Sequence, residues 1–188
     1  MGQVALQLPM TAEEFLAWDK NQAERWEFVA GEVFAMTGAS TPHVTVAMNV
    51  AFALRQHLRG TPCRTYINDN KLRVEASNAY YYPDVMVTCS ASDAQDPLIQ
   101  REPTLLVEVL SPSTASDDRG GKFHAYRTLP TLREYLLIDP STRHSDLYRL
   151  GSEGLWVLHP AAPTDSVHLA SVELTISAAV LWDEVPQA

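Results

Sequence analysis

The sequence predicts one domain of the α/β (α+β) class, in which helices flank a mixed central β-sheet. Its 188 residues are enough to bury one sizeable hydrophobic core. Segments with the patterns of strands and of helices are interleaved along the whole chain, which is typical of a sheet covered by helices. We find no internal repeat and no linker, so residues 1–188 are expected to form a single domain.

The first predicted elements are a short helix and two short strands. Thr11 and Glu14 have the spacing of a capping box, which begins a helix. Residues 26–38 have the pattern of two strands around a turn at Ala30–Gly31. Glu32 begins the second strand, and taken alone it is interpreted as an exposed charge at the end of a strand.

A long helix is predicted next. Thr41–Pro42 combines a cap with a proline at the first helical position, and Gly60 is expected to stop the helix at about Arg59. Most faces of this helix are apolar, so we expect it to be deeply packed. His43 lies in the first turn, where both a structural histidine and a contact with an anion are consistent with the sequence.

Strand patterns dominate the following segment. Residues 63–68 and 71–75 are predicted to be strands joined at the turn-rich triplet Asn68–Asn70. Pro83 is compatible with the start of a strand but not with its middle. The apolar residues Val85–Val87 are therefore predicted to form the next strand of the core.

The apolar run Leu105–Leu110 is predicted to be the central strand. A continuous apolar run is typical of a strand that is buried on both faces. Glu108 interrupts this run, and an unpaired charge is costly at such a position. The sequence therefore predicts that Glu108 is paired with a metal ion, a cation or a proton.

A helix is expected to follow this strand. Thr114 and Asp117 have a helix-opening pattern, and the helix is expected to run to Leu129. Lys122 and Tyr126 are four residues apart, so they are predicted to lie on the same face.

The remaining segments complete the predicted sheet. Residues 90–103 are polar and contain proline, so they are expected to form a loop. Residues 134–139 are predicted to be a strand, 146–150 and 155–158 a hairpin, and 177–182 a short helix.

The charge of the chain argues against a broad basic surface for nucleic acid. It has 14 basic and 23 acidic residues, a formal net charge of -9. A local basic groove stays open as a hypothesis, because several arginines are grouped in the sequence: Arg55, Arg59, Arg64 and Arg73.

The two cysteines and the N-terminal sequence indicate a cytoplasmic protein. Cys63 and Cys89 are 26 positions apart, and a domain of this size does not need a disulfide framework, so we expect reduced thiols. Residues 1–10 lack the pattern of a signal peptide, and no apolar run approaches membrane-spanning length. We therefore expect no membrane partner.

Two acidic residues on separate apolar strands indicate a possible metal site. Asp84 precedes one strand and Glu108 lies within the other, and carboxylates from neighbouring strands suit Mg²⁺ or Mn²⁺. Such a cation can activate water and stabilise charge on a phosphate, and Lys122 is suited to position that water or to deprotonate it. Paired acids of this kind are also common as structural ion-pair partners.

At these residues the sequence resembles a known family. Pro83–Asp84, the segment Glu108-Val-Leu-Ser-Pro-Ser-Thr114, and Asp118-Arg-Gly-Gly-Lys122 with Tyr126 are similar to the Uma2 (DUF820) family. That family belongs to the PD-(D/E)XK nuclease superfamily. The similarity extends to further segments and covers nearly the whole chain: Glu14-Phe-Leu, Trp26-Glu-Phe-Val-Ala-Gly-Glu32, His43 and Leu132-Arg-Glu-Tyr135.

The resemblance implies a restriction-endonuclease-like fold with a metal site at one end of the sheet. It implies that Asp84, Glu108 and the backbone carbonyl of Val109 bind the cation, Mg²⁺ or Mn²⁺. Leu110 stands where the superfamily has lysine, and Lys122 on the following helix is expected to supply that function.

Three further residues take their expected roles from the same resemblance. Glu32 matches the Gly-Glu position of the family and becomes a possible metal ligand. His43 and Tyr126 are expected to contact the metal ligands without binding the cation, and Tyr126 is equally compatible with a position in the core.

The expected function is that of a Mg²⁺-dependent endodeoxyribonuclease, a hydrolase of phosphodiester bonds in DNA. A homodimer is expected by analogy, since cutting two strands favours two sites. One alternative is a catalytically silent module on the same fold that binds nucleic acid or protein. A glycoside hydrolase with two carboxylates is less favoured, because no aromatic-rich stretch for sugar binding lies near the two acids.

Overall fold

The computed structural model describes residues 5–6, 9–36 and 38–186 and confirms the mixed α+β class. Its central sheet has six strands, and β9 and β10 run parallel while all other neighbours are antiparallel. In spatial order the strands are β12 (Trp156–Ala161), β11 (His144–Leu150), β10 (Glu134–Asp139), β9 (Pro103–Val109), β7 (Val85–Thr88) and β4 (Arg64–Ile67).

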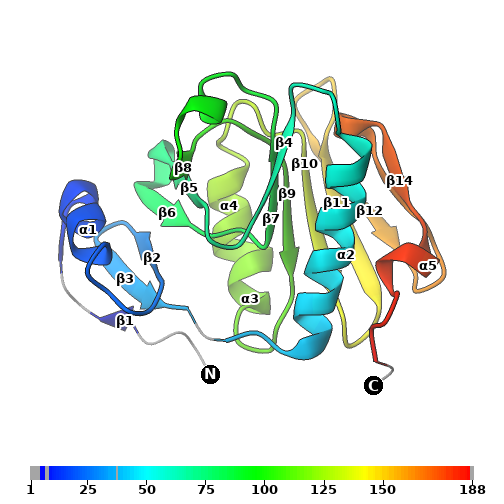
Figure 1. The fold of residues 1–188 in the computed structure, drawn as a ribbon, viewed down its shortest axis with the longest axis horizontal. Helices are drawn as coiled ribbons and strands as arrows, with labels where there is room; N and C mark the ends of the chain where they lie inside the picture. The colour runs from blue at the N-terminus through cyan, green and yellow to red at the C-terminus, as the bar shows by residue number, and fades with distance from the viewer. Residues whose placement is uncertain (1–4, 7–8, 37, 187–188) are drawn as a thin grey trace.

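A second sheet of six strands and the helix α1 (Ala12–Asp19) lie at one side of the central sheet (Figure 1). Their spatial order is β1 (Ala5–Leu6), β3 (Glu32–Ala35), β2 (Trp26–Val29), β6 (Ala79–Tyr81), β5 (Lys71–Val74) and β8 (Ile99–Gln100). The predicted capping box begins α1, since the Thr11 and Glu14 side chains each accept a hydrogen bond from the other residue's backbone N–H.

The long helix α2 (Thr41–His57) runs along the front of the central sheet in Figure 1. With the C-terminal elements it covers one face of that sheet. These elements are β13 (Val167–Leu169), β14 (Leu174–Ile176) and α5 (Ala178–Leu181). The other face packs against α4 (Phe123–Tyr126) and the second sheet.

The alternation of side chains along β9 determines which face Glu108 occupies. Leu105, Val107 and Val109 pack in the core beneath α2. Leu106 and Leu110 pack in the core on the opposite face. Because successive side chains of a strand point to opposite faces, Glu108 lies with the second set, toward α4 and the second sheet.

The predicted strand pair around Asn68–Asn70 is divided between the two sheets. β4 pairs with β7 in the central sheet, whereas β5 pairs with β6 and β8 in the second sheet. The prediction of two strands is confirmed, but the turn between them carries the chain from one sheet to the other. The expected loop at 90–103 is wrong in part, because Ile99–Gln100 forms β8 and Pro103 begins β9.

The predicted helix after the central strand has a different form. It consists of α3 (Ala115–Asp117), a π-helical turn (Asp118–Lys122) and α4. Thr114 does not cap it with its side chain, so that expectation is wrong. Ser111 orders the start of α3 instead. Its backbone oxygen accepts a hydrogen bond from the Ala115 N–H, and its hydroxyl oxygen accepts one from the Thr114 N–H.

The expectation of reduced thiols is also wrong, because Cys63 and Cys89 form a disulfide. Arg64 and Thr88 are paired in the antiparallel ladder of β4 and β7, so the residues just beyond them, Cys63 and Cys89, face one another. The strand register places these two side chains together, and spacing along the sequence does not reveal it. The structure shows no helix, over the ranges that it describes, that is long and apolar enough to cross a membrane.

Reduction of this disulfide is expected to lower the free energy of unfolding. The bond closes a loop with a sequence separation of 26, for which the chain-entropy model gives about 3.5 kcal/mol. Urea unfolding with and without reductant measures the difference. A Cys63→Ser/Cys89→Ser variant is the control and should not respond to reductant, while an unchanged wild-type curve would contradict the prediction.

Candidate active site

Asp84 is held at the end of β7 by contacts to two other elements. Its Oδ2 accepts a hydrogen bond from the Val109 backbone N–H at 2.8 Å, and its Oδ1 lies 3.0 Å from His43 Nε2. The first residue of β7, Val85, is opposite Val107 of the antiparallel strand β9. β7 therefore does not extend as far as the level of Val109. The carboxylate therefore satisfies a β9 N–H that has no partner on β7.

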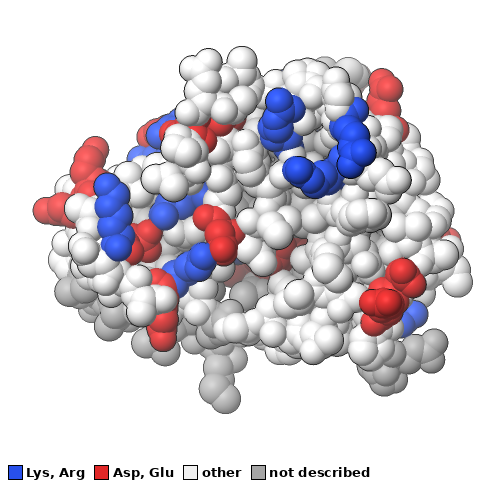
Figure 2. All heavy atoms as spheres, viewed as in Figure 1, with Lys and Arg blue, Asp and Glu red and all other residues white. Residues whose placement is uncertain are grey.

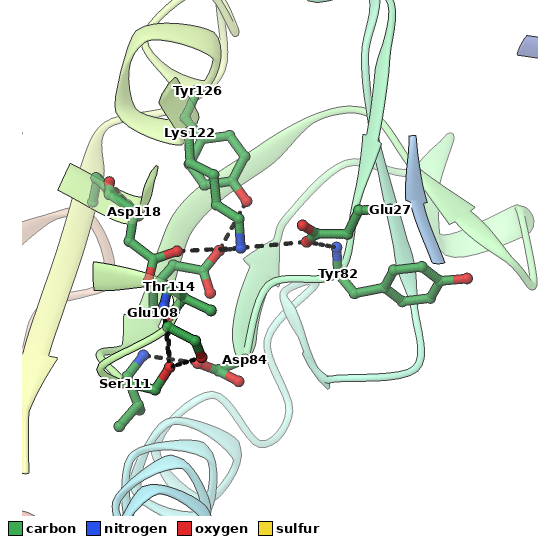
Figure 3. A network of polar contacts seen from close by, with 12 residues as sticks. Glu27, Tyr82, Asp84, Glu108, Ser111, Thr114, Asp118, Lys122 and Tyr126 are labelled. Atoms are coloured by element: carbon green, nitrogen blue, oxygen red, sulfur yellow. Dashed lines mark hydrogen bonds and ion pairs between the residues drawn. The ribbon is translucent and has the colours of Figure 1, made fainter. Parts of the chain in front are cut away.

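Glu108 belongs to a buried cluster of three carboxylates around one ammonium group (Figure 3). Lys122 Nζ lies 3.3 Å from Glu27 Oε1, 3.3 Å from Glu108 Oε1 and 3.2 Å from Asp118 Oδ1. Only the contact with Glu108 has the geometry of a hydrogen bond. The four residues are 5% (Lys122), 3% (Glu27 and Glu108) and 1% (Asp118) exposed, so water screens these charges little.

The cluster is assembled from β2, β9 and the π-helical turn. Asp118 and Lys122 are separated by four residues within this turn. The Asp118 backbone oxygen accepts a hydrogen bond from the buried Tyr135 hydroxyl at 3.0 Å, which fixes the turn on β10. One turn later Tyr126 donates its hydroxyl to Glu108 Oε1 at 2.8 Å. Glu108 Oε1 thus accepts hydrogen bonds from Lys122 and Tyr126, the two side chains that the sequence predicts on one helix face.

Burial and charge shift the pKa values of this cluster. Burial raises the pKa of Glu108 well above its usual value, and Asp118, Asp84 and Glu27 act in the same direction against the opposing effect of Lys122. Burial also raises the pKa of Glu27. Burial by itself would lower the pKa of Lys122, but the attraction of its three carboxylates prevails and raises it well above the usual value.

The raised pKa values of Glu108 and Glu27 predict that the contribution of these two groups to stability falls as the pH rises from mildly acid values. Folding raises the pKa of Glu108 and Glu27 above 4.5, so above that pH the folded protein holds more protons than the unfolded chain. The contribution of these two groups to the free energy of unfolding is then greatest below about pH 4.5. It decreases as the pH rises through their folded-state pKa values.

Urea unfolding at a series of pH values, without divalent cations, measures this slope. Glu108→Gln removes one titrating group and should flatten the slope by up to about 1.4 kcal/mol per pH unit. A difference in stability between the wild type and Glu108→Gln that does not change with pH would contradict the prediction.

Asp84 and the buried cluster open on one cavity of 490 Å³, which we call the acidic cavity. The ion pair of Arg25 and Asp69, at 2.6 Å, lies in its lining, as do Gly38, Ser40 and His43. Acidic side chains outnumber basic ones among the described residues that line it: Glu27, Asp69, Asp84, Glu108 and Asp118 against Arg25 and Lys122.

The structure brings most of the predicted site residues together. Asp84, Glu108, Val109, Lys122 and His43 line the acidic cavity. Tyr126 lies behind them in the core and contacts Glu108. Glu32 is exposed at the start of β3 and is not among the described residues that line the cavity.

Two residues of the cluster were not predicted from the sequence. Glu27 lies in the same Trp26–Glu32 segment that led to Glu32, and Asp118 precedes Lys122 by four residues. The signal for Glu27 is an acid between Trp26 and Phe28 in a strand that is otherwise apolar. That signal is the same as the one that identifies Glu108 in β9.

The donor set fits a hard divalent cation. Three buried carboxylates share one ammonium group, and Asp118 Oδ1 has only its ion pair with Lys122 and accepts no hydrogen bond. Over the described ranges no group of three or more His, Cys, Asp or Glu side chains has the arrangement of a complete metal site. Asp84 and Glu108 line one cavity, and Mg²⁺ is commonly bound by one or two carboxylates while it keeps several waters.

Comparisons with known proteins identify the family of the chain. The model of the Uma2 family, described as "Putative restriction endonuclease", matches residues 12–180. The chain is 34% identical over 173 residues to the uncharacterized protein slr1290 of Synechocystis sp. (92% of this chain and 91% of the relative). It is 34% identical over 160 residues to the uncharacterized protein sll1609 of the same organism (84% and 90%).

A solved structure shares the fold. It is the crystal structure of "a putative nuclease belonging to DUF820" from Anabaena variabilis, with a TM-score of 0.77 and 16% sequence identity. The match covers 95% of this chain and 100% of that one. The solved structure shows that the restriction-endonuclease-like fold is shared, and the family match over residues 12–180 shows that the chain belongs to the Uma2 family.

Proposed function

We propose that this protein is a divalent-metal-dependent endonuclease that hydrolyses phosphodiester bonds of DNA. The observation that carries the proposal is the meeting of Asp84, Glu108 and Lys122 at one cavity, although they come from three separate segments. A structural ion pair requires only one carboxylate for each ammonium group. The excess of buried acid here is better explained by a cation that arrives with the substrate.

Asp84 and Glu108, with the backbone carbonyl of Val109, are the proposed ligands of Mg²⁺ or Mn²⁺. When bound, the cation would supply activation of water and stabilisation of the charge that develops on the phosphate. His43 holds Asp84 Oδ1, and Tyr126 holds Glu108 Oε1. These two contacts orient the carboxylates, as hydrogen bonds to metal ligands commonly do.

Lys122 acts in this proposal as a fixed cation. Because its pKa is raised well above the usual value, the ammonium group stays protonated at neutral pH and cannot serve as a base. It keeps Glu108, Glu27 and Asp118 in place and offers its remaining N–H groups to a water or to a phosphate oxygen.

The reaction forms one bond to phosphorus and breaks another. A water oxygen attacks the phosphorus atom and the bond from phosphorus to the departing sugar oxygen breaks. The attacking water gives up a proton, and the departing oxygen takes up a proton from solvent to leave as a hydroxyl group. Glu27 is the proposed acceptor of the proton from the attacking water, since it lines the cavity, contacts Lys122 and has a pKa raised by burial.

A catalytically silent binding module is the second candidate. The observation that favours it is charge, because the acidic cavity and the net charge of -9 both repel nucleic acid when no cation is bound. A calorimetric titration with Mn²⁺ separates the two functions. Mn²⁺ binding by the wild type that is lost in Asp84→Asn would exclude the silent module. Absence of Mn²⁺ binding by the wild type would exclude the nuclease.

Cleavage of supercoiled plasmid tests the nuclease directly. We expect nicked and linear products with Mg²⁺ or Mn²⁺, none with chelator and none from Asp84→Asn. Glu32→Gln is the matched control, because Glu32 is exposed outside the acidic cavity and its loss should leave the rate unchanged. Preference for RNA of the same sequence would overturn the proposed substrate.

A further inference from the structure

Three exposed arginines surround a second cavity, at the C-terminal end of α2. This cavity has a volume of 230 Å³ and is lined by Arg55, Arg59 and Arg64, with no acidic side chain among the described residues. We call it the arginine cavity. Figure 2 shows a basic cluster at this end of α2, with an uncharged surface beside it along the face that α2 occupies in Figure 1. Arg73, the fourth arginine grouped with these in the sequence, is paired with Glu75 instead.

The rest of the chain does not neutralise these three arginines. Several other arginines form ion pairs with acidic side chains: Arg25, Arg73, Arg101, Arg119 and Arg149. Within the ranges that the structure describes, no such pair involves Arg55, Arg59 or Arg64, although acidic residues outnumber basic ones by 23 to 14. Guanidinium groups that share one cavity repel one another, so the arrangement is unfavourable unless an anion binds between them.

The end of a helix does not by itself explain this cluster. Arg55 lies in the last turn of α2, where the helix dipole favours a positive charge. Arg64 belongs to β4, and its Nη1 donates hydrogen bonds to the backbone oxygens of residues 61–63. These three bonds use one nitrogen atom of the guanidinium group and fix the group at the cavity. Cys63, which the disulfide joins to Cys89, lines the same cavity and fixes the backbone next to Arg64.

We propose that the arginine cavity binds a phosphate of the DNA backbone, at a distance from the phosphate that is cleaved. The N–H groups of a guanidinium form a planar fork that matches two phosphate oxygens. Exposed arginines that no acid neutralises attract the backbone whatever the base sequence. The inference rests on the proposed function in one respect, because the DNA bound here is taken to be the DNA that is cut at the acidic cavity.

The helix α2 sets the distance between the two contacts. His43 lines the acidic cavity, and Arg55, twelve residues later in the same helix, lines the arginine cavity. They are about 18 Å apart along the helix axis, which corresponds to about five base pairs of duplex. No acidic residue occurs in α2, so no charge on this helix repels the backbone between the cavities. This alignment favours a polymer that reaches both cavities over a free phosphate ion.

The salt dependence of DNA binding tests the contact. A labelled duplex is titrated with protein at KCl concentrations from 50 to 200 mM, without divalent cations so that no strand is cut. Each phosphate contact contributes about 0.9 to the slope of log affinity against log salt, so Arg55→Gln/Arg59→Gln should reduce that slope by about 1.8. Over this range the wild type should therefore lose about tenfold more affinity than the variant does.

Lys20→Gln/Arg127→Gln is the matched control for this measurement. It removes the same net charge from two exposed residues outside both cavities, and its slope should equal that of the wild type. An unchanged slope for Arg55→Gln/Arg59→Gln, or an equal decrease in the control, would overturn the proposal.

Titration with inorganic phosphate separates the DNA backbone from a free ion as the occupant. Calorimetry of the wild type should show much weaker binding of phosphate than of the duplex, because a single ion makes none of the other backbone contacts. Phosphate binding that is lost in Arg55→Gln/Arg59→Gln, together with a DNA slope that does not change, would assign the cavity to a free phosphate ion and overturn the DNA contact.

Cleavage kinetics separate this contact from the cleavage site. Arg55→Gln/Arg59→Gln should raise KM for plasmid on the order of tenfold at 200 mM KCl and leave kcat unchanged, because the contact is remote from the reacting phosphate. A lower kcat with an unchanged KM would overturn the remote contact. DNA binding with the expected slopes but no cleavage by the wild type would refute the proposed function and leave the arginine contact standing. Cleavage with a salt slope that does not depend on the arginines would do the reverse.

Discussion

Glu108→Gln is expected to abolish metal-dependent cleavage, with a fall in rate of at least about 10³-fold, the upper end of what the loss of one electrostatic stabiliser costs. Glutamine has the shape of glutamate but lacks the charge that a divalent cation requires. It keeps an oxygen that can accept from Tyr126, which lies 2.8 Å from Glu108 Oε1, so the packing around β9 is retained. The measurement is plasmid cleavage under single-turnover conditions, with Mg²⁺ and with Mn²⁺.

The fold of this variant provides the control. Lys122 keeps Glu27 and Asp118 as partners after the substitution, so the buried ammonium group remains neutralised. Circular dichroism and urea unfolding should therefore show a folded protein. Cleavage at the wild-type rate by folded Glu108→Gln would refute the assignment of Glu108 as a metal ligand.

Lys122→Met is expected to lower the free energy of unfolding by about 3–5 kcal/mol at neutral pH, as breaking a buried ion pair from one side commonly does. Methionine fills much of the same volume but leaves Glu27, Glu108 and Asp118 buried without a cation. The three carboxylates then repel one another in surroundings that water does not screen. The loss should exceed that of any exposed lysine.

The pH dependence of this loss identifies its cause. Without Lys122 the pKa values of Glu108 and Glu27 rise further, and a raised carboxyl pKa contributes stability at low pH that is lost as the pH rises. Lys122→Met should therefore approach wild-type stability toward pH 4 and diverge from it above. Lys20→Met, at an exposed position after α1, should stay within about 0.5 kcal/mol at every pH.

A double variant separates charge from packing. In Lys122→Met/Glu108→Gln one of the stranded carboxylates is removed together with the ammonium group, so the double variant should be more stable than Lys122→Met alone. Equal or lower stability of the double variant would show that lost packing, and not uncompensated charge, causes the effect.

Local patterns in the sequence predicted those parts of the fold that depend on neighbouring residues. The capping box of Thr11 and Glu14 and the apolar run of β9 are confirmed. The long helix lies where it was predicted, but the prediction of its cap is wrong, because Ser40 and not Thr41 caps α2. Helix capping and side-chain alternation act over one to four residues, so a single stretch of sequence contains the information. For the same reason Glu108 was recognised as an acid in an apolar strand, and Lys122 with Tyr126 as neighbours on one helix face.

The tertiary structure alone decided which distant segments meet. It divided β4 and β5 between two sheets, joined Cys63 to Cys89, and brought Glu27 of β2 against Lys122 while Glu32 stayed exposed. It also placed the Lys122 ammonium group among three carboxylates from three elements, and their attraction raises its pKa well above the usual value. The sequence by itself indicated Asp84, Glu108 and Lys122 as candidate residues from local patterns and motifs. The distances between their side chains and the charges around them arise from long-range packing, which local patterns do not contain.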